Sequence, residues 1–479
     1  MGFIKQGYEG DERILEIVVI GMGYTGIPVA VMLADVEGFN VTGVQRRSKR
    51  SGWKINCLNE GKNPIGGDEP GLDGLIAKVV KKGTFHVTDD ITICKKADVI
   101  LIDVQTPVDE KHVPQYESLK EVSEATGKLM KKGAMIIIES TVAPGTTNCI
   151  VKPILEKSSG LKAGKDFNLV YSYERVMVGR LLYNMAFMPR IVGGLTPECT
   201  RRGMEFYKHI VKAELIPTDC TTAEVAKVTE NTYRDVNIAF ANEIALVCES
   251  LGVNVHDVRR LVNSLPNDPS NPAKNPVRNM HMPGGGVGGH CLPKDPWLLK
   301  YGLDTYGKSR FTPEIIVESR RLNDSMPQHM KDLIEEALSE KGIWLKDAKI
   351  CILGYAFLAD SDDTRNTPAL TLYNLLKDNC QEVIVHDPYV KESEEQVPIT
   401  NSLEAGVTGK NCLAVMTNHK EYCRIKLDWL KQKMATAAIV DGRNIFNPEN
   451  CRKAGFSYRG VGIGANGSKP SRERCNARK

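Results

Sequence analysis

The segment ILEIVVIGMGYTGIPVAVMLADVEG, residues 14–38, decides the fold of this chain of 479 residues. Residues 14–20 are almost entirely apolar and have the length of a buried strand, whereas residues 27–38 have the apolar pattern of a helix. Between them lies a G-x-G-x-x-G sequence whose glycines are Gly21, Gly23 and Gly26. Glycines at this spacing permit a tight turn and let the backbone approach a pyrophosphate at the helix N-terminus. The segment therefore predicts a dinucleotide-binding loop, which also contains Tyr24 and Thr25; a turn that binds nothing is the less favoured interpretation.

The same alternation of strand and helix continues to about residue 212. Further strand-like apolar runs lie at residues 41–45, 97–104 and 134–140. Continuous apolar strands spaced by helices indicate a parallel, doubly wound sheet with both faces covered. We expect residues 1–212 to form a dinucleotide-binding Rossmann domain.

A second, smaller β-α-β pattern follows in the last third of the chain. Its strand-like runs lie at residues 349–357, 382–388, 412–418 and 436–442. We expect residues 326–479 to form a second Rossmann-like domain and residues 213–325 to form a central helical region. The predicted fold is α/β, with two doubly wound domains joined by a long central helix.

The central region opens with the pattern of one long helix. Thr221 and Glu224 fit a capping box, and Gly252 supplies a stop. The interval of about 30 residues corresponds to roughly 45 Å of helix. Its apolar positions exceed what one small domain needs and predict a homodimer built partly on this helix; they are Val225, Val228, Val236, Phe240, Ile244 and Val247.

The amino-acid composition indicates which broad class of protein the chain belongs to. The chain is 42% hydrophobic and 25% charged, which is typical of a globular protein. Lys and Arg number 63 and Asp and Glu 59, a net charge of +4 that does not favour a nucleic-acid partner. There is no apolar run of about 18 residues and no signal-peptide core, so we expect no membrane partner. Thirteen scattered cysteines without a C-x-x-C pair favour a cytoplasmic protein, and the nine histidines have no metal-ligand spacing, so no metal is predicted.

The residues at the end of the second predicted strand help to distinguish between NAD and NADP as the cofactor. An acid normally stands there and hydrogen-bonds the adenosine ribose. Here the strand ends at Gln45, and five polar residues follow: Arg46, Arg47, Ser48, Lys49 and Arg50. Glutamine can still bond a ribose hydroxyl, whereas an arginine can pair with a 2′-phosphate or lie in a solvated loop. We predict NAD as the cofactor and keep NADP as an alternative.

The sequence GGHCLPKDP, residues 288–296, has the features of a nucleophile site. Its glycines bring the backbone close to a ligand, and Pro293 suits the first turn of a helix. That position places Cys291 near a helix N-terminus, which lowers a thiol pKa. Lys294 and Asp295 follow as charged partners, so we predict that Cys291 is the nucleophile.

Polar residues mark two further places for a site. Lys227 and Asn231 are i, i+4 neighbours on the long helix and project together, either as a solvated stripe or, as we favour, on an active-site face. Ligands of open α/β sheets bind at the carboxyl ends of strands. The polar residues that follow predicted strands are Thr106, Pro107, Glu139, Thr141, Glu174 and Arg175.

In this order, the motifs resemble the UDP-glucose/GDP-mannose dehydrogenase family over nearly the whole chain. The matching segments are GMGYTGIPVA, VQTPV, ESTVAPGTT, AEVAKVTENTYRDVNIAFANE, GGVGGHCLPKDP and GYAFLADSDDTRNTPAL. The resemblance implies two Rossmann-like domains joined by a long helix that dimerises. It also implies oxidation of a nucleotide sugar's C6 alcohol to a carboxylate with two nicotinamide cofactors per turnover.

The resemblance assigns catalytic roles to individual residues. Cys291 matches the nucleophile that captures the aldehyde as a thiohemiacetal and later carries the thioester. Lys227 and Asn231 match the pair that stabilises the oxyanion. The residues that match the surroundings of the hydrolytic water are Asp295, Thr141 and Glu174.

The resemblance also implies which residues bind the cofactor and the substrate. The expected cofactor contacts outside the glycine loop are Gln45, Arg46, Thr106, Pro107 and Glu139. The expected substrate contacts are Arg175, Gly289, Arg365 and Arg278, the last donated by the partner subunit. Three positions depart from the family pattern, namely Gln45 in place of an acid, Leu358 in place of a lysine, and Asn444 after Arg443.

Within the family, His290 and the pair Pro296–Trp297 resemble the UDP-N-acetylhexosamine branch, whereas Lys294 resembles the UDP-glucose branch. We therefore expect a 6-dehydrogenase of the N-acetylmannosamine or N-acetylgalactosamine kind, with UDP-glucose or GDP-mannose as alternative substrates, that makes a uronic acid for surface polysaccharide. A 6-phosphogluconate-type dehydrogenase needs no cysteine and is less favoured. A non-catalytic dinucleotide sensor would not need Cys291, Lys227 and Asn231 together.

Overall fold

The computed structural model describes residues 14–49, 51–66, 69–264, 279–309, 311–393 and 395–464. The chain divides into two compact units. The first comprises Met1–Glu230 and Trp297–Thr312, and the second Asn231–Pro296 and Pro313–Lys479.

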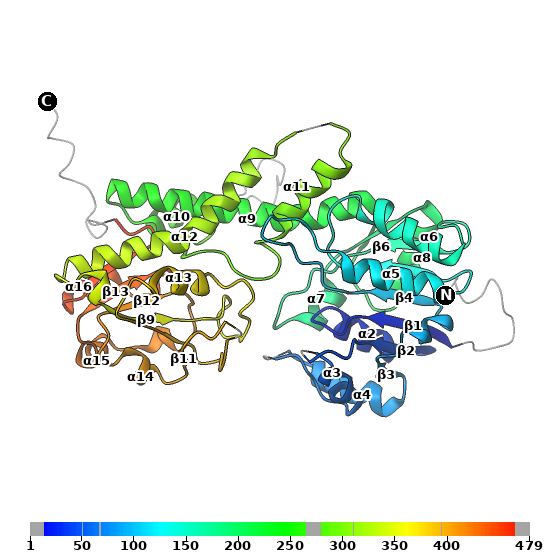
Figure 1. The fold of residues 1–479 in the computed structure, drawn as a ribbon, viewed down its shortest axis with the longest axis horizontal. Coiled ribbons are helices and arrows are strands. Elements are labelled where there is room, and N and C mark those ends of the chain that lie inside the picture. Colours follow the sequence, from blue (N-terminus) through cyan, green and yellow to red (C-terminus); the bar gives the residue numbers. More distant parts are fainter. Residues whose placement is uncertain are drawn as a thin grey trace. The chain divides into compact units, whose positions relative to one another are not determined.

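The first unit is built on an eight-stranded sheet of order β3-β2-β1-β4-β5-β6-β7-β8 (Figure 1). Its strands are β1 Leu15–Ile20, β2 Phe39–Val44, β3 Phe85–Thr88, β4 Val99–Ile102, β5 Met135–Ile138, β6 Asn168–Tyr171, β7 Arg190–Gly194 and β8 Leu215–Asp219. Neighbouring strands are parallel except β6 and β7, which are antiparallel. The predicted doubly wound α/β sheet is therefore confirmed, except that β7 and β8 run antiparallel to the other six strands.

Helices cover both faces of this sheet. The helices of the first unit are α2 Gly26–Asp35, α3 Trp53–Asn59, α4 Leu72–Lys82, α5 Glu117–Leu129, α6 Lys152–Ser159, α7 Leu181–Phe187, α8 Pro197–Tyr207 and α11 Asp295–Tyr306, with short turns of helix η1 Ile91–Lys95 and η2 Thr147–Val151. In β1, Ile17 and Val19 pack into one core, and Val18 and Ile20 pack into the other. A strand buried on both faces needs apolar side chains at every position. This requirement explains the continuous apolar run from which the sequence predicted β1.

The second unit has a six-stranded, fully parallel sheet of order β11-β10-β9-β12-β13-β14. Its strands are β9 Lys349–Leu353, β10 Glu382–His386, β11 Ile399–Thr400, β12 Cys412–Val415, β13 Ala438–Asp441 and β14 Ser457–Gly460. Its helices are α10 Val255–Val262, α12 Glu314–Ser339, α13 Pro368–Leu376, α14 Leu403–Val407, α15 Leu427–Lys433 and α16 Pro448–Lys453, with η4 Leu345–Asp347 and η5 Tyr422–Arg424. Helices α12 and α13 cover one face and α14 and α15 the other (Figure 1).

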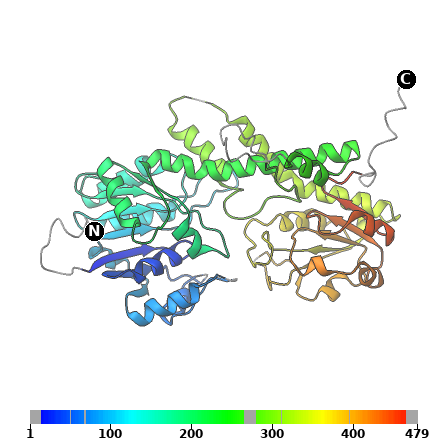
Figure 2. The ribbon, with the colours of Figure 1, turned by 180° about the vertical axis from the view of Figure 1, so that it is seen from behind.

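The long helix α9, Cys220–Leu251, has 32 residues and can be followed as one helix in Figure 2. The predicted stop is confirmed, because Gly252 has φ +71° and the Val253 N–H donates to the Cys248 carbonyl. The predicted capping box is wrong. The Asp219 side chain accepts the Thr222 N–H, whereas the Glu224 carboxylate accepts N–H groups of Gly145 and Thr147 from another part of the chain.

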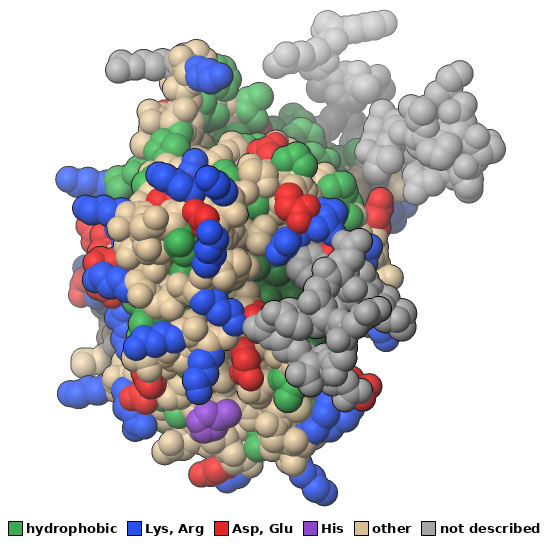
Figure 3. Space-filling model, turned by 90° about the vertical axis from the view of Figure 1, so that its right-hand side faces the viewer, with side chains coloured by type: hydrophobic (Ala, Val, Ile, Leu, Met, Phe, Trp, Pro, Cys, Tyr) green, Lys and Arg blue, Asp and Glu red, His purple; other side chains and the backbone are tan. Residues whose placement is uncertain are grey.

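Charged side chains of both signs lie on the face that Figure 3 shows. In Figure 3, Lys and Arg side chains lie among Asp and Glu side chains across the face shown. Within the described ranges, the length and apolar character needed to cross a bilayer do not occur together in any helix.

Candidate active site

The glycine loop has the shape that a pyrophosphate site needs. Gly21 has φ +108°, and a Cβ atom there would lie 2.2 Å from the Asp103 carbonyl oxygen. A Cβ atom at Gly26 would lie 1.8 Å from the Gly21 carbonyl oxygen, so both glycines are required by close packing. At Gly23 a Cβ atom would meet nothing within 4 Å. The loop therefore leaves open space at the start of α2, which fits the diphosphate of a dinucleotide.

Gln45 lies against this loop, directly after β2. Its Oε1 accepts the Met22 N–H at 3.1 Å, and its Nε2 donates to Ser51 Oγ at 3.0 Å. Arg46 pairs with Glu121 on the surface, with 2.8 Å between Nη2 and the carboxylate oxygen. Gln45 is thus held against the glycine loop, and the guanidinium of Arg46 faces an acid.

The residues that follow β4 and β5 lie close together. Thr106 is buried, and its hydroxyl donates to the Thr141 carbonyl oxygen at 2.5 Å. Pro107 is exposed beside it. The Glu139 carboxylate, in contrast, is buried in an ion pair with Arg190 and accepts the Tyr207 hydroxyl. The structure therefore brings Thr106 and Thr141 together, whereas the Glu139 carboxylate is engaged inside the protein.

Lys227 is fixed by the segment that follows β6. It is buried, and its Nζ donates to the Glu174 carbonyl oxygen at 2.8 Å and lies 3.6 Å from the Glu174 carboxylate. The next residue, Arg175, forms an ion pair with Glu230, which also accepts the Tyr173 hydroxyl at 2.8 Å. The sequence did not single out Glu230; its position three residues after Lys227 on one helix face was the available signal.

Asp295 organises the cysteine segment. It is fully buried, and its Oδ1 accepts Lys294 Nζ at 2.7 Å while its Oδ2 accepts Asn231 Nδ2 at 2.6 Å. The Asp295 N–H donates to the Cys291 carbonyl at 2.9 Å, so the partly buried Cys291 lies one turn before this acid. Burial and the charge of Lys294 lower the pKa of His290 to about 4.

The prediction that Pro293 lies in the first turn of a helix is wrong. Residues 291–294 form a turn, and α11 begins at Asp295, with Pro296 as its second residue. Because the Cys291 carbonyl still accepts the Asp295 N–H, the cysteine nevertheless directly precedes the helix.

Arg365 and Gly289 meet through their backbones. The Gly289 N–H donates to the Arg365 carbonyl at 2.8 Å, and Asn366 Nδ2 donates to the Gly289 carbonyl at 3.1 Å. The Arg365 guanidinium pairs with Asp363, with 2.8 Å from Nε to Oδ1. A Cβ atom at Gly289 would lie 2.9 Å from the Phe357 ring. Sequence reasoning missed Phe357 and Asn366, although the paired glycines signalled a close neighbour.

The other expected residues are placed as follows. Tyr24 and Thr25 lie in the turn before α2, and Leu358 is 40% exposed. Asn444 has a left-handed backbone with φ +54°. Arg278 lies outside the described residues. Within the described part of the chain, acidic, histidine and cysteine side chains do not gather in groups of three or more that would hold a metal ion.

Comparison with known proteins agrees with these observations. Residues 15–211, 221–325 and 351–448 match the NAD binding, central and UDP binding domains of the UDP-glucose/GDP-mannose dehydrogenase family. A UDP-N-acetyl-D-mannosamine dehydrogenase of Pyrococcus horikoshii is 36% identical over 451 residues, which cover 94% of this chain and 100% of the relative. One of Campylobacter jejuni is 33% identical and covers 86% of this chain and 97% of its own.

A solved structure shows the same likeness in three dimensions. The crystal structure of an NDP-N-acetyl-D-galactosaminuronic acid dehydrogenase from Methanosarcina mazei Go1 has a TM-score of 0.85 and 42% identity. The match covers 96% of this chain and 97% of the other. With its dinucleotide loop, its cysteine segment and these relatives, the chain belongs to the UDP-glucose/GDP-mannose dehydrogenase family and is an NAD-dependent nucleotide-sugar dehydrogenase.

Proposed function

We propose that this protein oxidises the C6 alcohol of a UDP-N-acetylhexosamine, of the N-acetylmannosamine or N-acetylgalactosamine kind, to the carboxylate. The relatives named for these two sugars support the substrate class. The observation that carries the chemistry is the buried Asp295, bound by Lys294 and Asn231 one turn after Cys291. The product is a uronic acid, which we assign to cytoplasmic synthesis of a surface-polysaccharide precursor.

The proposed reaction passes through covalent intermediates on Cys291. The glycine loop and Gln45 would hold NAD, which would accept one hydride in each of the two oxidations, with a second NAD replacing the first NADH. After the alcohol has become an aldehyde, the Cys291 thiolate adds to its carbon and forms a C–S bond. Oxidation of this thiohemiacetal, in which C6 gives up its hydride and the hydroxyl gives up its proton, gives a thioester. Water then cleaves the C–S bond and releases the acid and the thiolate.

Other side chains have distinct roles in this proposal. The Lys227 ammonium and the Asn231 amide, one helical turn apart on α9, donate to the oxygen on which negative charge develops. Asp295 accepts a proton from the hydrolytic water, which Thr141 and Glu174 help to orient. Arg365, Arg175 and Gly289 contact the nucleotide sugar, and the partner subunit donates Arg278.

The stoichiometry tests the proposed reaction. Complete turnover is expected to form two NADH and one uronate per sugar, because one carbon is oxidised twice. The measurement follows NADH absorbance and product mass with a panel of UDP-N-acetylhexosamines, UDP-glucose and GDP-mannose. One NADH per sugar with accumulating aldehyde would contradict the thioester route, and a preference for UDP-glucose or GDP-mannose would contradict the substrate class.

Because Gln45 stands where an acid is expected, we predict that the protein discriminates only incompletely between NAD and NADP. An aspartate at this position would repel a 2′-phosphate, whereas glutamine is neutral. Arg46 is an exposed cation paired with Glu121, and such a group contributes about 0–1 kcal/mol, less than about tenfold in affinity. We expect NAD to be used, NADP to be tolerated, and Gln45→Asp to sharpen the preference for NAD.

Steady-state kcat/KM values for both cofactors check this prediction. Arg46→Ala is the companion variant, because it removes the cation that follows Gln45 in the sequence and leaves Gln45 in place. A wild-type kcat/KM for NADP at least about tenfold above that for NAD would show that the arginines bind the phosphate.

We also propose that the protein is a homodimer built partly on α9. Apolar side chains remain exposed along this helix: Val225 39%, Tyr233 69%, Phe240 52%, Val247 46% and Leu251 64%. Val228, in contrast, is buried in the core of the first unit. Covering a large apolar side chain contributes about 1.5–3 kcal/mol, so Phe240→Glu is expected to weaken the dimer strongly.

Sedimentation velocity across a range of concentrations measures this effect. Phe187→Glu is the matched control, because Phe187 is 48% exposed but lies on α7. A wild-type monomer at micromolar concentration, or equal weakening by both substitutions, would refute the assignment of the interface to α9.

A further inference from the structure

The two sheets repeat one local geometry at the loop after their first strand. Gly21 follows β1 and Gly354 follows β9, with φ +108° and +95°. Each donates its N–H to the last residue of the neighbouring strand, Gly21 to Val44 at 2.9 Å and Gly354 to His386 at 2.8 Å. The loop after β9 therefore begins in the same way as the glycine loop of the first unit.

The two loops differ in the side chain that faces them. In the first unit the residue after β2 is the neutral Gln45, which accepts the Met22 N–H. In the second unit the residue after β10 is Asp387, which accepts the equivalent N–H of Tyr355 at 2.7 Å. The second loop thus has a carboxylate of its own chain at the position that the neutral Gln45 takes in the first unit.

Both carboxylate oxygens of Asp387 accept hydrogen bonds from backbone N–H groups. Its Oδ2 accepts the N–H groups of Tyr355 and Ala356 at 2.7 and 2.9 Å, and its Oδ1 accepts those of Tyr389 and Val390 at 2.8 and 3.0 Å. Burial raises the pKa of this carboxyl, but the hydrogen bonds from His419 and the backbone more than offset it and hold the pKa below its ordinary value. The side chain is fully buried and carries its charge inside the domain.

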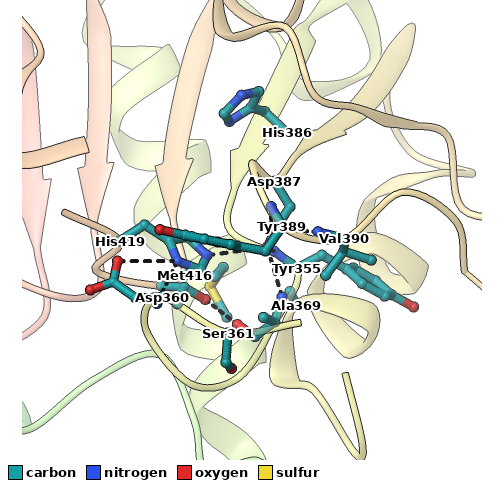
Figure 4. A network of polar contacts seen from close by, with 12 residues as sticks. Tyr355, Asp360, Ser361, Ala369, His386, Asp387, Tyr389, Val390, Met416 and His419 are labelled. Atoms are coloured by element: carbon teal, nitrogen blue, oxygen red, sulfur yellow. Dashed lines mark hydrogen bonds and ion pairs between the residues drawn. The ribbon is translucent and has the colours of Figure 1, made fainter. Parts of the chain in front are cut away.

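His419 joins the carboxylate to the far end of the loop. Figure 4 shows that Asp387 and His419 point toward one another, whereas His386 points away. His419 Nε2 lies 3.2 Å from Asp387 Oδ2, and its Nδ1 accepts the Asp360 N–H at 2.9 Å. Because Nδ1 is an acceptor, the ring proton is on Nε2 and donates to the carboxylate. Asp387 and His419 therefore hold both ends of the segment from Tyr355 to Asp360.

The loop continues from there to the cysteine segment. Phe357, Arg365 and Asn366 belong to it, and Arg365 and Asn366 exchange two hydrogen bonds with Gly289, at 2.8 and 3.1 Å. A Cβ atom at Gly288 would lie 2.5 Å from Phe357 Cβ, so the two segments are in close contact. Cys291 is only two residues beyond Gly289. The position of the thiol thus depends on the shape of the loop.

We propose that Asp387, together with His419, is a positioning residue for the Cys291 segment, because the two side chains fix the shape of the loop after β9. The inference rests on the proposed role of Cys291. Asp387 touches neither substrate nor cofactor in this proposal; it acts through the loop that carries Arg365 and Asn366.

The test is Asp387→Ala in the full-length protein, with sodium formate as a probe that returns a carboxylate to the vacated position. We expect KM for the nucleotide sugar to rise by about tenfold or more, because a buried charge that satisfies four backbone donors is lost. Alkylation of Cys291 by iodoacetamide is expected to accelerate several-fold (about threefold or more), because the segment loosens. Formate is expected to reverse both changes, and sodium chloride at equal ionic strength is expected to reverse neither. The dissociation constant for NAD is expected to stay within about twofold, because the cofactor loop belongs to the other unit.

Asp378→Ala is the matched control, since Asp378 is an exposed acid at the end of α13 in the same domain. Unchanged KM and alkylation in folded Asp387→Ala would overturn the proposal, and so would changes that formate fails to reverse. If Asp387→Ala does not fold, His419→Gln decides: a raised KM with faster alkylation supports the proposal, and wild-type values overturn it. Alkylation requires no turnover, so these results remain separate from a failure of the cysteine mechanism, which loss of acid formation in Cys291→Ala tests.

Discussion

Cys291→Ala is expected to lower the rate of uronate formation by at least about a thousandfold, because loss of a covalent nucleophile commonly costs several powers of ten. The contacts proposed for the nucleotide sugar do not involve the sulfur atom. Binding is therefore expected to remain close to that of the wild type. Product formation by mass spectrometry and nucleotide-sugar binding by calorimetry measure the two effects separately.

Cys248→Ala is the control for this substitution. Cys248 is 3% exposed on α9 and packs in the core of the second unit, so it serves packing rather than chemistry. Its alanine variant is expected to retain activity. Near-full activity of Cys291→Ala combined with an inactive Cys248→Ala would mean that the nucleophile is wrongly assigned.

Arg320→Met is expected to destabilise the second unit by about 3–5 kcal/mol at neutral pH, because it leaves a buried carboxylate without its counter-charge. Arg320 and Asp235 are both fully buried and form an ion pair between α12 and α9. Asn323 adds hydrogen bonds of 2.9 Å to the Asp235 carbonyl and carboxylate. Urea unfolding followed by circular dichroism measures the loss.

The loss is expected to shrink at low pH. Burial raises the pKa of Asp235 to about 6 against the opposing charge of Arg320, so the native state takes up a proton more readily than the unfolded state. This protonation stabilises the folded form as pH falls below about 6 and ceases to do so as pH rises through that value. Without Arg320 the pKa rises further. The difference between variant and wild type is therefore expected to be smaller at pH 5 than at pH 8.

Arg321→Met is the matched control for the buried ion pair. Arg321 is the next residue, its side chain is 67% exposed, and it pairs with Glu318 on the surface. Exposed pairs contribute about 0–1 kcal/mol, so this variant is expected to unfold almost as the wild type does. Equal effects of the two substitutions, or a loss that does not depend on pH, would contradict the assignment of the stability to the Asp235–Arg320 pair.

Local patterns in the sequence determined the elements of the fold. Successive apolar residues of β1 pack alternately into the two cores, and the glycine spacing before α2 encodes a turn of six residues. Both patterns involve residues that are neighbours in the sequence, and both could therefore be predicted from it. The stop at Gly252 was predictable for the same reason, because a left-handed backbone at a helix end favours glycine. The capping box failed because Glu224 found its donors at Gly145 and Thr147, which lie more than 70 residues earlier in the chain.

The sequence predicted the chemical groups of the candidate site, but only the tertiary structure determined which residues surround them. Cys291, Lys227 and Asn231 were recognisable from residue type and spacing. The bond between Asn231 and Asp295 spans 64 residues, and the contact of Gly289 with Asn366 spans 77. No local sequence pattern predicted the contact between Asp387 and His419, which are 32 residues apart. Side chains find such partners only when strands and helices pack, because hydrogen bonds between distant segments depend on the register of the sheet and not on sequence spacing.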